Sequence, residues 1–139
     1  MIREIDHIAI AVFDLEEASR RLGRILDSQI LTRKKMESEG IEAVMFKVGR
    51  TKIELVCPLS EDSVVAKFLR KRGEGIHHIA MTVDDMDSEV ARLKAEEVML
   101  VDENVREGAM GCRIAFIHPR STPGILLELV ELPPSEENE

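Results

Sequence analysis

A repeated segment is the feature that most constrains how this chain folds. The stretch Asp6–Asp14 (DHIAIAVFD) recurs as His77–Asp85 (HHIAMTVDD), which places His7 and His78 71 residues apart. Self-similarity of this kind indicates a structural unit that occurs twice. Because 139 residues correspond to about one domain, we expect one domain built from two similar halves.

Both copies of the repeat are expected to form a strand that leads into a helix. Asp14 and Asp85 stand at the ends of the two strands. A short acidic side chain at that position accepts hydrogen bonds from the first turn of a helix, which predicts helices over residues 16–26 and 86–96. Strand-like runs follow at residues 29–34, 40–48 and 52–57 in the first half and at 99–101, 113–118 and 124–131 in the second. Each half therefore reads as a βαβββ unit.

The remaining segments are a linker and a tail. We expect a single domain over residues 1–132, with module one at about 1–57, a linker at about 58–75 and module two at about 76–132. The linker contains a short helix, roughly Ser63–Arg72, that ends at Gly73 because glycine commonly terminates helices. Residues 133–139 are acidic and poor in apolar side chains, which predicts a disordered tail. The fold class is α+β, with two tandem βαβββ modules.

Side-chain alternation along the repeated strands separates a bulky face from a small one. Neighbouring residues of a strand point to opposite faces. The aliphatic residues at positions 8, 10 and 12 therefore share one face, while His7 shares the other with two alanines. In the second copy His78 lies on the face of Ala80 and Thr82, and His77 has the opposite parity. A histidine on a face with so little side-chain volume, twice, indicates room for a ligand.

A carboxylate in the last strand of each half completes this pattern. Glu54 and Glu128 each stand between two aliphatic residues in a run that otherwise reads as buried strand. A lone buried carboxylate is costly unless a cation or a hydrogen-bond partner compensates it. A single histidine is more often structural, and a single strand glutamate more often lies at the surface. The duplicated pair instead favours a metal site with His7, Glu54, His78 and Glu128 as ligands.

The donor types narrow the choice of metal without fixing it. Two imidazoles and two carboxylates suit Co²⁺, Mn²⁺, Zn²⁺, Ni²⁺ or Fe²⁺. Mg²⁺ fits less well because it prefers oxygen ligands. An iron dioxygenase is disfavoured, since such enzymes usually bind iron through two histidines and one carboxylate. We therefore expect a divalent transition metal.

Composition excludes several other functions. Lys and Arg number 19 against 27 Asp and Glu, and this net charge of −8 argues against a general nucleic-acid surface. Four Phe, with no Tyr and no Trp, leave almost no platform for base stacking and no tyrosine chemistry. No apolar run approaches the about 20 residues that cross a bilayer, and the start MIREIDH lacks the plan of a secretory signal. Cys57 and Cys112 are too few for a disulfide framework and predict a reducing cytoplasm.

Other polar features have both a plain and a functional interpretation. A small basic cluster on the linker helix consists of Lys67, Arg70, Lys71 and Arg72. It is either a solvated face or a contact for the phosphates of an anionic substrate. The loop Gly108–Gly111 is either a turn or a cover over a ligand. His118 is expected to be structural or to support a metal ligand, and both cysteines are expected to be small buried hydrophobes.

Several segments together resemble a known superfamily. Those that resemble the vicinal oxygen chelate superfamily are Asp6–Val12, Ile53–Leu55, Gly73–Ala80 and Gly124–Leu129. Within it, the chain is similar to the methylmalonyl-CoA epimerase family at Ala66–Leu69, Gly108–Gly111 and Ala115–Pro119. The resemblance covers residues 4–132, and it implies paired βαβββ modules that form a curled mixed sheet around a metal, usually in a homodimer.

The resemblance also implies roles for individual residues. The metal ligands of the family correspond to His7, Glu54, His78 and Glu128, the same four that strand parity selects, and Co²⁺ is the favoured ion. Some members have Gln at the Glu54 position, so the site in this chain is more anionic. Family epimerases invert the α-carbon of methylmalonyl-CoA with two opposed bases, through a metal-stabilised enolate, and Glu128 corresponds to one of these bases.

The second base is a departure from the family pattern. A gapless alignment on Gly40 and Gly49 puts Ser38 at the position of the family's glutamate, and a neutral serine is a poor base. Glu37 and Glu39 stand on either side of Ser38, and a small shift would bring one of them inward. We expect Glu39 to serve as the second base, with Glu37 as the alternative.

The expected function is therefore a metal-dependent epimerase that interconverts the two forms of methylmalonyl-CoA by two-base proton transfer. This chemistry needs no tyrosine, no nucleophilic cysteine and no organic cofactor. Two other functions stay open: a glyoxalase I-like lactoylglutathione lyase, and a non-enzymatic ligand-binding protein of the same fold. The expected partners are an acyl-CoA substrate and a second copy of the chain, with no nucleic acid and no membrane.

Overall fold

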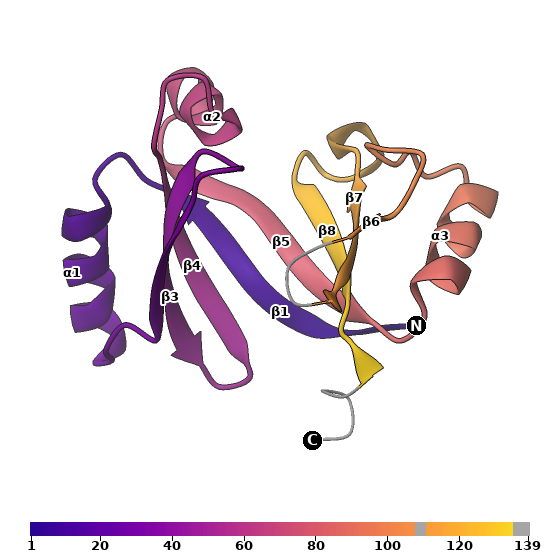
Figure 1. The fold of residues 1–139 in the computed structure, drawn as a ribbon, viewed down its shortest axis with the longest axis horizontal. Helices are drawn as coiled ribbons and strands as arrows, with labels where there is room; N and C mark the ends of the chain where they lie inside the picture. Colours follow the sequence, from indigo (N-terminus) through magenta and orange to yellow (C-terminus); the bar gives the residue numbers. More distant parts are fainter. Residues whose placement is uncertain (108–110, 135–139) are drawn as a thin grey trace. The chain divides into compact units, whose positions relative to one another are not determined.

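The computed structural model describes residues 1–107 and 111–134. These residues form three α-helices and eight strands, and the strands make one mixed sheet in the order β2-β3-β4-β1-β5-β8-β7-β6 (Figure 1). None of the helices in this part of the chain is both long and apolar enough to cross a membrane. The predicted α+β class is confirmed. The Gly108–Gly111 loop and the acidic tail fall wholly or mostly outside the described residues.

The chain divides into two compact units. One comprises residues 7–77, and the other combines residues 1–6 with residues 78–139. We call them the N-terminal unit and the C-terminal unit. Two strands contribute residues to both units, namely β1 (Ile2–Ala11) and β5 (Gly75–Val83). The single domain expected over residues 1–132 stays a prediction.

The N-terminal unit contains the first βαβββ set. After β1 come α1 (Leu15–Leu26), β2 (Thr32–Met36), β3 (Ile41–Val48), β4 (Thr51–Pro58) and the linker helix α2 (Val64–Arg72). Strand β4 pairs in parallel with β1 and antiparallel with β3, and β3 pairs antiparallel with β2. The predicted linker helix is confirmed, with Ser63 as its N-cap and Gly73 as its C-cap.

The C-terminal unit contains the second set. After β5 come α3 (Met86–Ala95), β6 (Arg106–Glu107), β7 (Arg113–Ile117), a 3₁₀ helix η2 (Pro119–Ser121) and β8 (Leu126–Glu131). Strand β8 pairs in parallel with β5 and antiparallel with β7, and β7 pairs antiparallel with β6. The βαβββ order therefore occurs twice, as the repeat predicted.

Two strands differ from the sequence prediction. The strand expected at residues 29–34 lies at 32–36, because its position is fixed by the ladder with β3 rather than by its own polar sequence. The strand expected at residues 99–101 was wrong: only an isolated bridge joins Leu100 to Ile117. Residues 101–104 are bends, since Asp102 and Asn104 favour turns. The edge strand is instead the short β6.

Helices cover the face of the strands in each unit that side-chain alternation identifies as bulky. Ile10 of β1 and Val12, which directly follows this strand, pack with Leu15 and Leu22 of α1. In the C-terminal unit the corresponding residues of β5 pack with α3. Within the two units, Figure 1 shows α1 beside β3 and β4, and α3 beside β7 and β8. This burial leaves the small faces of β1 and β5 on the other side of the sheet.

The linker helix α2 packs against the small face of the N-terminal unit. Val65 and Leu69 belong to one core cluster with Ala11 and Val56, which are paired on β1 and β4. These residues mark one end of that face. Toward the opposite end the next pairs along the same ladder are Ala9 with Glu54 and then His7 with Lys52.

The N-cap of α1 provides a test of helix energetics. The Asp14 carboxylate accepts a hydrogen bond from the Glu17 backbone N–H at 3.1 Å. We expect Asp14→Ala to lower the free energy of unfolding by about 1 kcal/mol, because a capping partner is lost. Urea unfolding of both proteins would measure this difference. Glu61→Ala, which removes an exposed carboxylate outside the helices, is the control, and equal effects of the two changes would contradict the capping role.

Candidate metal centre

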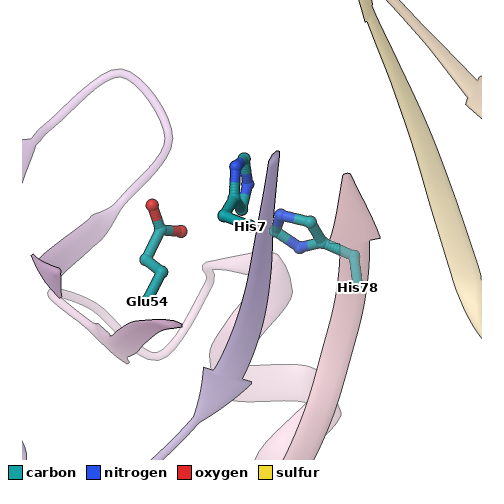
Figure 2. A group of neighbouring side chains, drawn as sticks. All are labelled: His7, Glu54 and His78. Atoms are coloured by element: carbon teal, nitrogen blue, oxygen red, sulfur yellow. The ribbon is translucent and has the colours of Figure 1, made fainter. Parts of the chain in front are cut away.

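Three of the four predicted ligands lie together. His7, Glu54 and His78 each offer one ligand atom, and these atoms all lie within 4.8 Å of one another. Figure 2 shows the three side chains directed toward one another from β1, β4 and β5. Glu54 is buried, with 7% of its surface exposed, and both histidines are half-buried.

The fourth predicted ligand contacts one of these histidines. A carboxylate oxygen of Glu128 lies 3.4 Å from Nε2 of His78. Glu128 is 7% exposed, like Glu54. The duplicated sequence pattern therefore gives two buried carboxylates, each near a histidine.

Strand register explains why these positions have room for a ligand. In each parallel ladder an alanine is the direct partner of the carboxylate: Ala9 pairs with Glu54, and Ala80 pairs with Glu128. Partners in a ladder project to the same face of the sheet. Because the two alanines are fully buried but small, the neighbouring glutamate side chains can extend over them toward the histidines.

The donor set fits a divalent metal ion. Donors that share one ion at bond lengths of 2.0–2.2 Å lie about 3–4.4 Å apart, so the observed cluster needs only small side-chain adjustments to hold an ion. Two imidazoles with two carboxylates are a donor set typical of borderline transition metals. Buried carboxylates also need a compensating cation. The His-Glu-His cluster is therefore a candidate divalent-metal site, and Glu128 is proposed as its fourth ligand.

Comparison with known proteins identifies the family. Residues 6–116 match the model of the glyoxalase/bleomycin resistance protein/dioxygenase superfamily. The human mitochondrial methylmalonyl-CoA epimerase is 38% identical over 126 residues, which are 90% of this chain and 72% of that protein. The chain belongs to the methylmalonyl-CoA epimerase family. This confirms the resemblance drawn from the sequence motifs.

Solved structures of the same family agree with this assignment. The methylmalonyl-CoA epimerase of Mycobacterium tuberculosis has 38% sequence identity and a TM-score of 0.86, over 99% of this chain and 93% of that one. A methylmalonyl-CoA epimerase solved with methylmalonyl-CoA and an ammonium ion has 34% identity and a TM-score of 0.85, over 96% and 97%. YqjC of Bacillus subtilis, an uncharacterised protein, is 38% identical over 99% of both chains. The family is one of isomerases.

The remaining histidines have structural contacts. The ring of His77 packs edge-on against Phe68 with 5.0 Å between the ring centroids, and burial lowers the pKa of His77. Nδ1 of His118 accepts a hydrogen bond from the Arg120 N–H at the start of η2. The structural role predicted for His118 is therefore confirmed, and His77 is not part of the cluster with His78.

The candidate second bases lie in the turn between β2 and β3. Glu37, Ser38 and Glu39 are all exposed, and the Glu39 N–H donates to the carbonyl of Met36. This turn leads directly into Ile41, the first residue of β3, which pairs with Pro58 at the end of β4. Pro58 is four residues from Glu54, which is about 13 Å along an extended strand. The turn is therefore at the opposite end of β4 from the pair formed by His7 and Lys52.

Neither the two cysteines nor the basic cluster of α2 belongs to the cluster of His7, Glu54 and His78. Within the described part of the chain, Cys57 and Cys112 are not joined in a disulfide, and both are half-buried. Burial raises the pKa of the Cys57 thiol, which packs beside the α1 core as a small hydrophobe. The four cationic residues of α2 are exposed, and Arg72 lies over the Phe68 ring at 5.8 Å. Their proposed contact with substrate phosphates stays a prediction.

Paired substitutions at His77 and His78 test the parity argument. We expect His78→Ala to weaken metal binding by more than the 10–100-fold loss typical of an outer partner, because it removes a direct ligand. His77→Ala should keep the metal, since His77 contacts Phe68 instead. Metal content after dialysis and titration calorimetry would measure both. Retention of metal by His78→Ala would overturn the assignment of this ligand.

Proposed function

We propose that this chain interconverts (R)- and (S)-methylmalonyl-CoA. The observation that carries the proposal is the cluster of His7, Glu54 and His78 in a member of the epimerase family. A solved relative is described in complex with methylmalonyl-CoA, which supports an acyl-CoA as the substrate. The small alanine face beneath the cluster supports it further, because the reacting part of a substrate needs room above the sheet.

Methylmalonyl-CoA requires a site that stabilises negative charge. Its α-proton lies between a thioester and a carboxylate, so removal of the proton places negative charge on the thioester oxygen. A divalent ion held by His7, Glu54, His78 and Glu128 would supply a Lewis acid where this charge develops. The protein side chains then have to hold the acyl group and move a proton.

Proton transfer requires two groups on opposite faces of the α-carbon. Glu128 accepts the α-proton from one face, and its two carboxylate oxygens allow it to serve as a ligand as well. Glu39, in its protonated form, returns a proton to the other face, which inverts the centre. The reverse reaction uses the same two groups with their roles exchanged, so protons balance over the cycle. The family relationship supports Glu128, and Glu39 is one of the two acidic neighbours of the aligned position Ser38, with Glu37 as the alternative.

The location of Glu39 sets a condition for this role. Its turn lies about 13 Å along β4 from Glu54, so the turn has to close toward the substrate for Glu39 to reach the α-carbon. Glu42, the next acidic residue along β3, bonds to Arg33 at 3.0 Å instead. The four residues of β3 that share the face of Glu54 are Ile41, Ala43, Met45 and Lys47, and none of them is a carboxylate.

We propose Co²⁺ as the preferred ion among those that suit the donor set, with Mn²⁺, Zn²⁺, Ni²⁺ and Fe²⁺ as alternatives. We also propose a homodimer, on the strength of the family resemblance. Cysteines such as Cys57 and Cys112, which are thiols rather than a disulfide, fit a reducing compartment, for which we propose the cytoplasm.

Isotope exchange is the direct test of the proposed reaction. We expect the metal-loaded protein to incorporate deuterium from D₂O at the α-carbon of methylmalonyl-CoA and to racemise it, as followed by proton NMR. A chelator should abolish the exchange, and added Co²⁺ should restore it. Methylglyoxal with glutathione should not be turned over. Turnover of that pair instead would establish a lactoylglutathione lyase, and no turnover of either substrate by metal-loaded protein would leave the proposed reaction untenable.

Substitutions in the β2–β3 turn test the second base. We expect Glu39→Gln to lower kcat by about 100-fold or more, because general acid–base groups contribute about 10²–10⁴-fold. Ser38→Ala should stay within about twofold of the wild type and serves as the matched control in the same turn, since a serine adds little as a base. Steady-state epimerisation rates would measure both. A mild Glu39→Gln together with a severe Glu37→Gln would transfer the role to Glu37.

A further inference from the structure

One cationic side chain lies directly beside the candidate metal ligands of the N-terminal unit. Lys52 of β4 is the ladder partner of His7 on β1, and it stands two residues before Glu54 on its own strand. Ladder partners, and residues two apart on a strand, project to the same face of the sheet. Adjacent strands are about 4.8 Å apart, and residues i and i+2 about 7 Å. Lys52 is therefore a close neighbour of both His7 and Glu54.

The repeat gives this position a different residue in the other unit. Where β1 and β4 pair His7 with Lys52, β5 and β8 pair His78 with Leu126. The ligands themselves are duplicated without change, as one histidine and one glutamate in each half. The residue beside the histidine is thus a point at which a charged side chain in one half is replaced by an apolar one in the other.

A second lysine on the same face shows that positive charge gathers at this end of the sheet. Lys47 of β3 is the direct partner of Lys52 in the antiparallel ladder. Like charges directly opposite each other destabilise a sheet, so negative charge near the two lysines is favourable. Lys47 is exposed and stands two strands from β1, whereas Lys52 is half-buried and stands one strand away. Of the two, Lys52 is the one placed to act at the cluster.

The proposed substrate brings further negative charge to the metal ligands. Glu54 and Glu128 together balance the charge of a divalent ion. The free carboxylate of a malonyl-type acyl group then adds one negative charge, and removal of the α-proton adds another. A second cation beside the ligands would offset that excess negative charge. It would also donate a strong hydrogen bond to the carboxylate, because charge-assisted hydrogen bonds are stronger in a partly buried site.

We propose that Lys52 binds the free carboxylate of the acyl group and so orients the substrate in the site. This inference rests on the proposed function. A symmetric set of two histidines and two glutamates cannot by itself distinguish the carboxylate end of the acyl group from the thioester end. The ammonium group beside His7, with leucine beside His78, provides that distinction. Lys52 is a positioning residue, and it takes no part in the proton transfers.

Matched substitutions at the two lysines test this role. Lys52→Met removes one charge with little change in side-chain length, and Lys47→Met removes the same charge on the same face one strand further from His7. We expect Lys52→Met to lower kcat/KM for methylmalonyl-CoA by about 10- to 150-fold, the range for one hydrogen bond to a charged group, mainly through a higher KM. Lys47→Met should stay within about twofold, because an exposed charge contributes little. Lys52→Arg should restore part of the loss.

Binding measurements distinguish a carboxylate contact from a phosphate contact. Methylmalonate carries the carboxylates without the coenzyme, and free coenzyme A carries the phosphates without the acyl group. We expect Lys52→Met to weaken inhibition by methylmalonate about as much as it raises KM, while inhibition by coenzyme A and the metal content stay unchanged. Weaker binding of coenzyme A with unchanged methylmalonate inhibition would overturn the carboxylate assignment, as would loss of the metal.

The wild-type protein separates the two hypotheses. A metal-loaded wild type that does not epimerise methylmalonyl-CoA defeats the proposed function itself. An active wild type with an unimpaired Lys52→Met, or with equal losses in Lys52→Met and Lys47→Met, defeats only the role of Lys52.

Discussion

Parallel pairing of the first and last strands of each βαβββ set is the constraint on which the rest of the structure depends. It makes Ala9 the neighbour of Glu54 and Ala80 the neighbour of Glu128, so that each carboxylate has a small partner on its own face. A slip of one residue in either ladder would turn the whole strand over. The carboxylates would then enter the face packed by α1 or α3, where aliphatic side chains offer no compensating charge. Register and site chemistry therefore select the same pairing.

Because of this register, the two faces of these strands have different roles: one packs in the hydrophobic core and the other bears the candidate metal ligands. The aliphatic side chains at alternate positions of β1 and β5 lie in the cores beneath α1 and α3, and their burial supplies the hydrophobic stabilisation of each unit. The opposite face buries Glu54 and Glu128, which favours folding only when a cation or a proton compensates their charge. Metal binding and folding are therefore expected to be coupled in this chain, since an ion that binds the folded state stabilises it.

Local sequence was enough to predict the features that depend on local geometry. Asp14, Asp85 and Ser63 mark the helix starts because capping is decided within one turn. Side-chain alternation identified His7 and His78, because the alternation can be read within a single strand. The limits of β2 and the bridge at Leu100 could not be read in this way, since partner strands distant in sequence decide them. Lys52 was missed for the same reason: its position beside His7 exists only in the register of β1 with β4.

The chain has a net charge of −8, so the places where positive side chains gather are candidate binding positions for an anionic ligand. The exposed cations of α2 are near the end of the small face that Ala11 and Val56 mark, whereas Lys52 is near the end marked by His7. An acyl-CoA has two anionic regions, the acyl carboxylate and the coenzyme phosphates, with a long neutral arm between them. Two separate cationic positions on one face suit such a ligand better than a single patch would. A glutathione hemithioacetal, in contrast, has no carboxylate at its reacting carbon and gives no reason for a cation beside only one of two equivalent histidines. The asymmetry between Lys52 and Leu126, on an otherwise duplicated frame, thus favours a substrate whose two ends differ in charge.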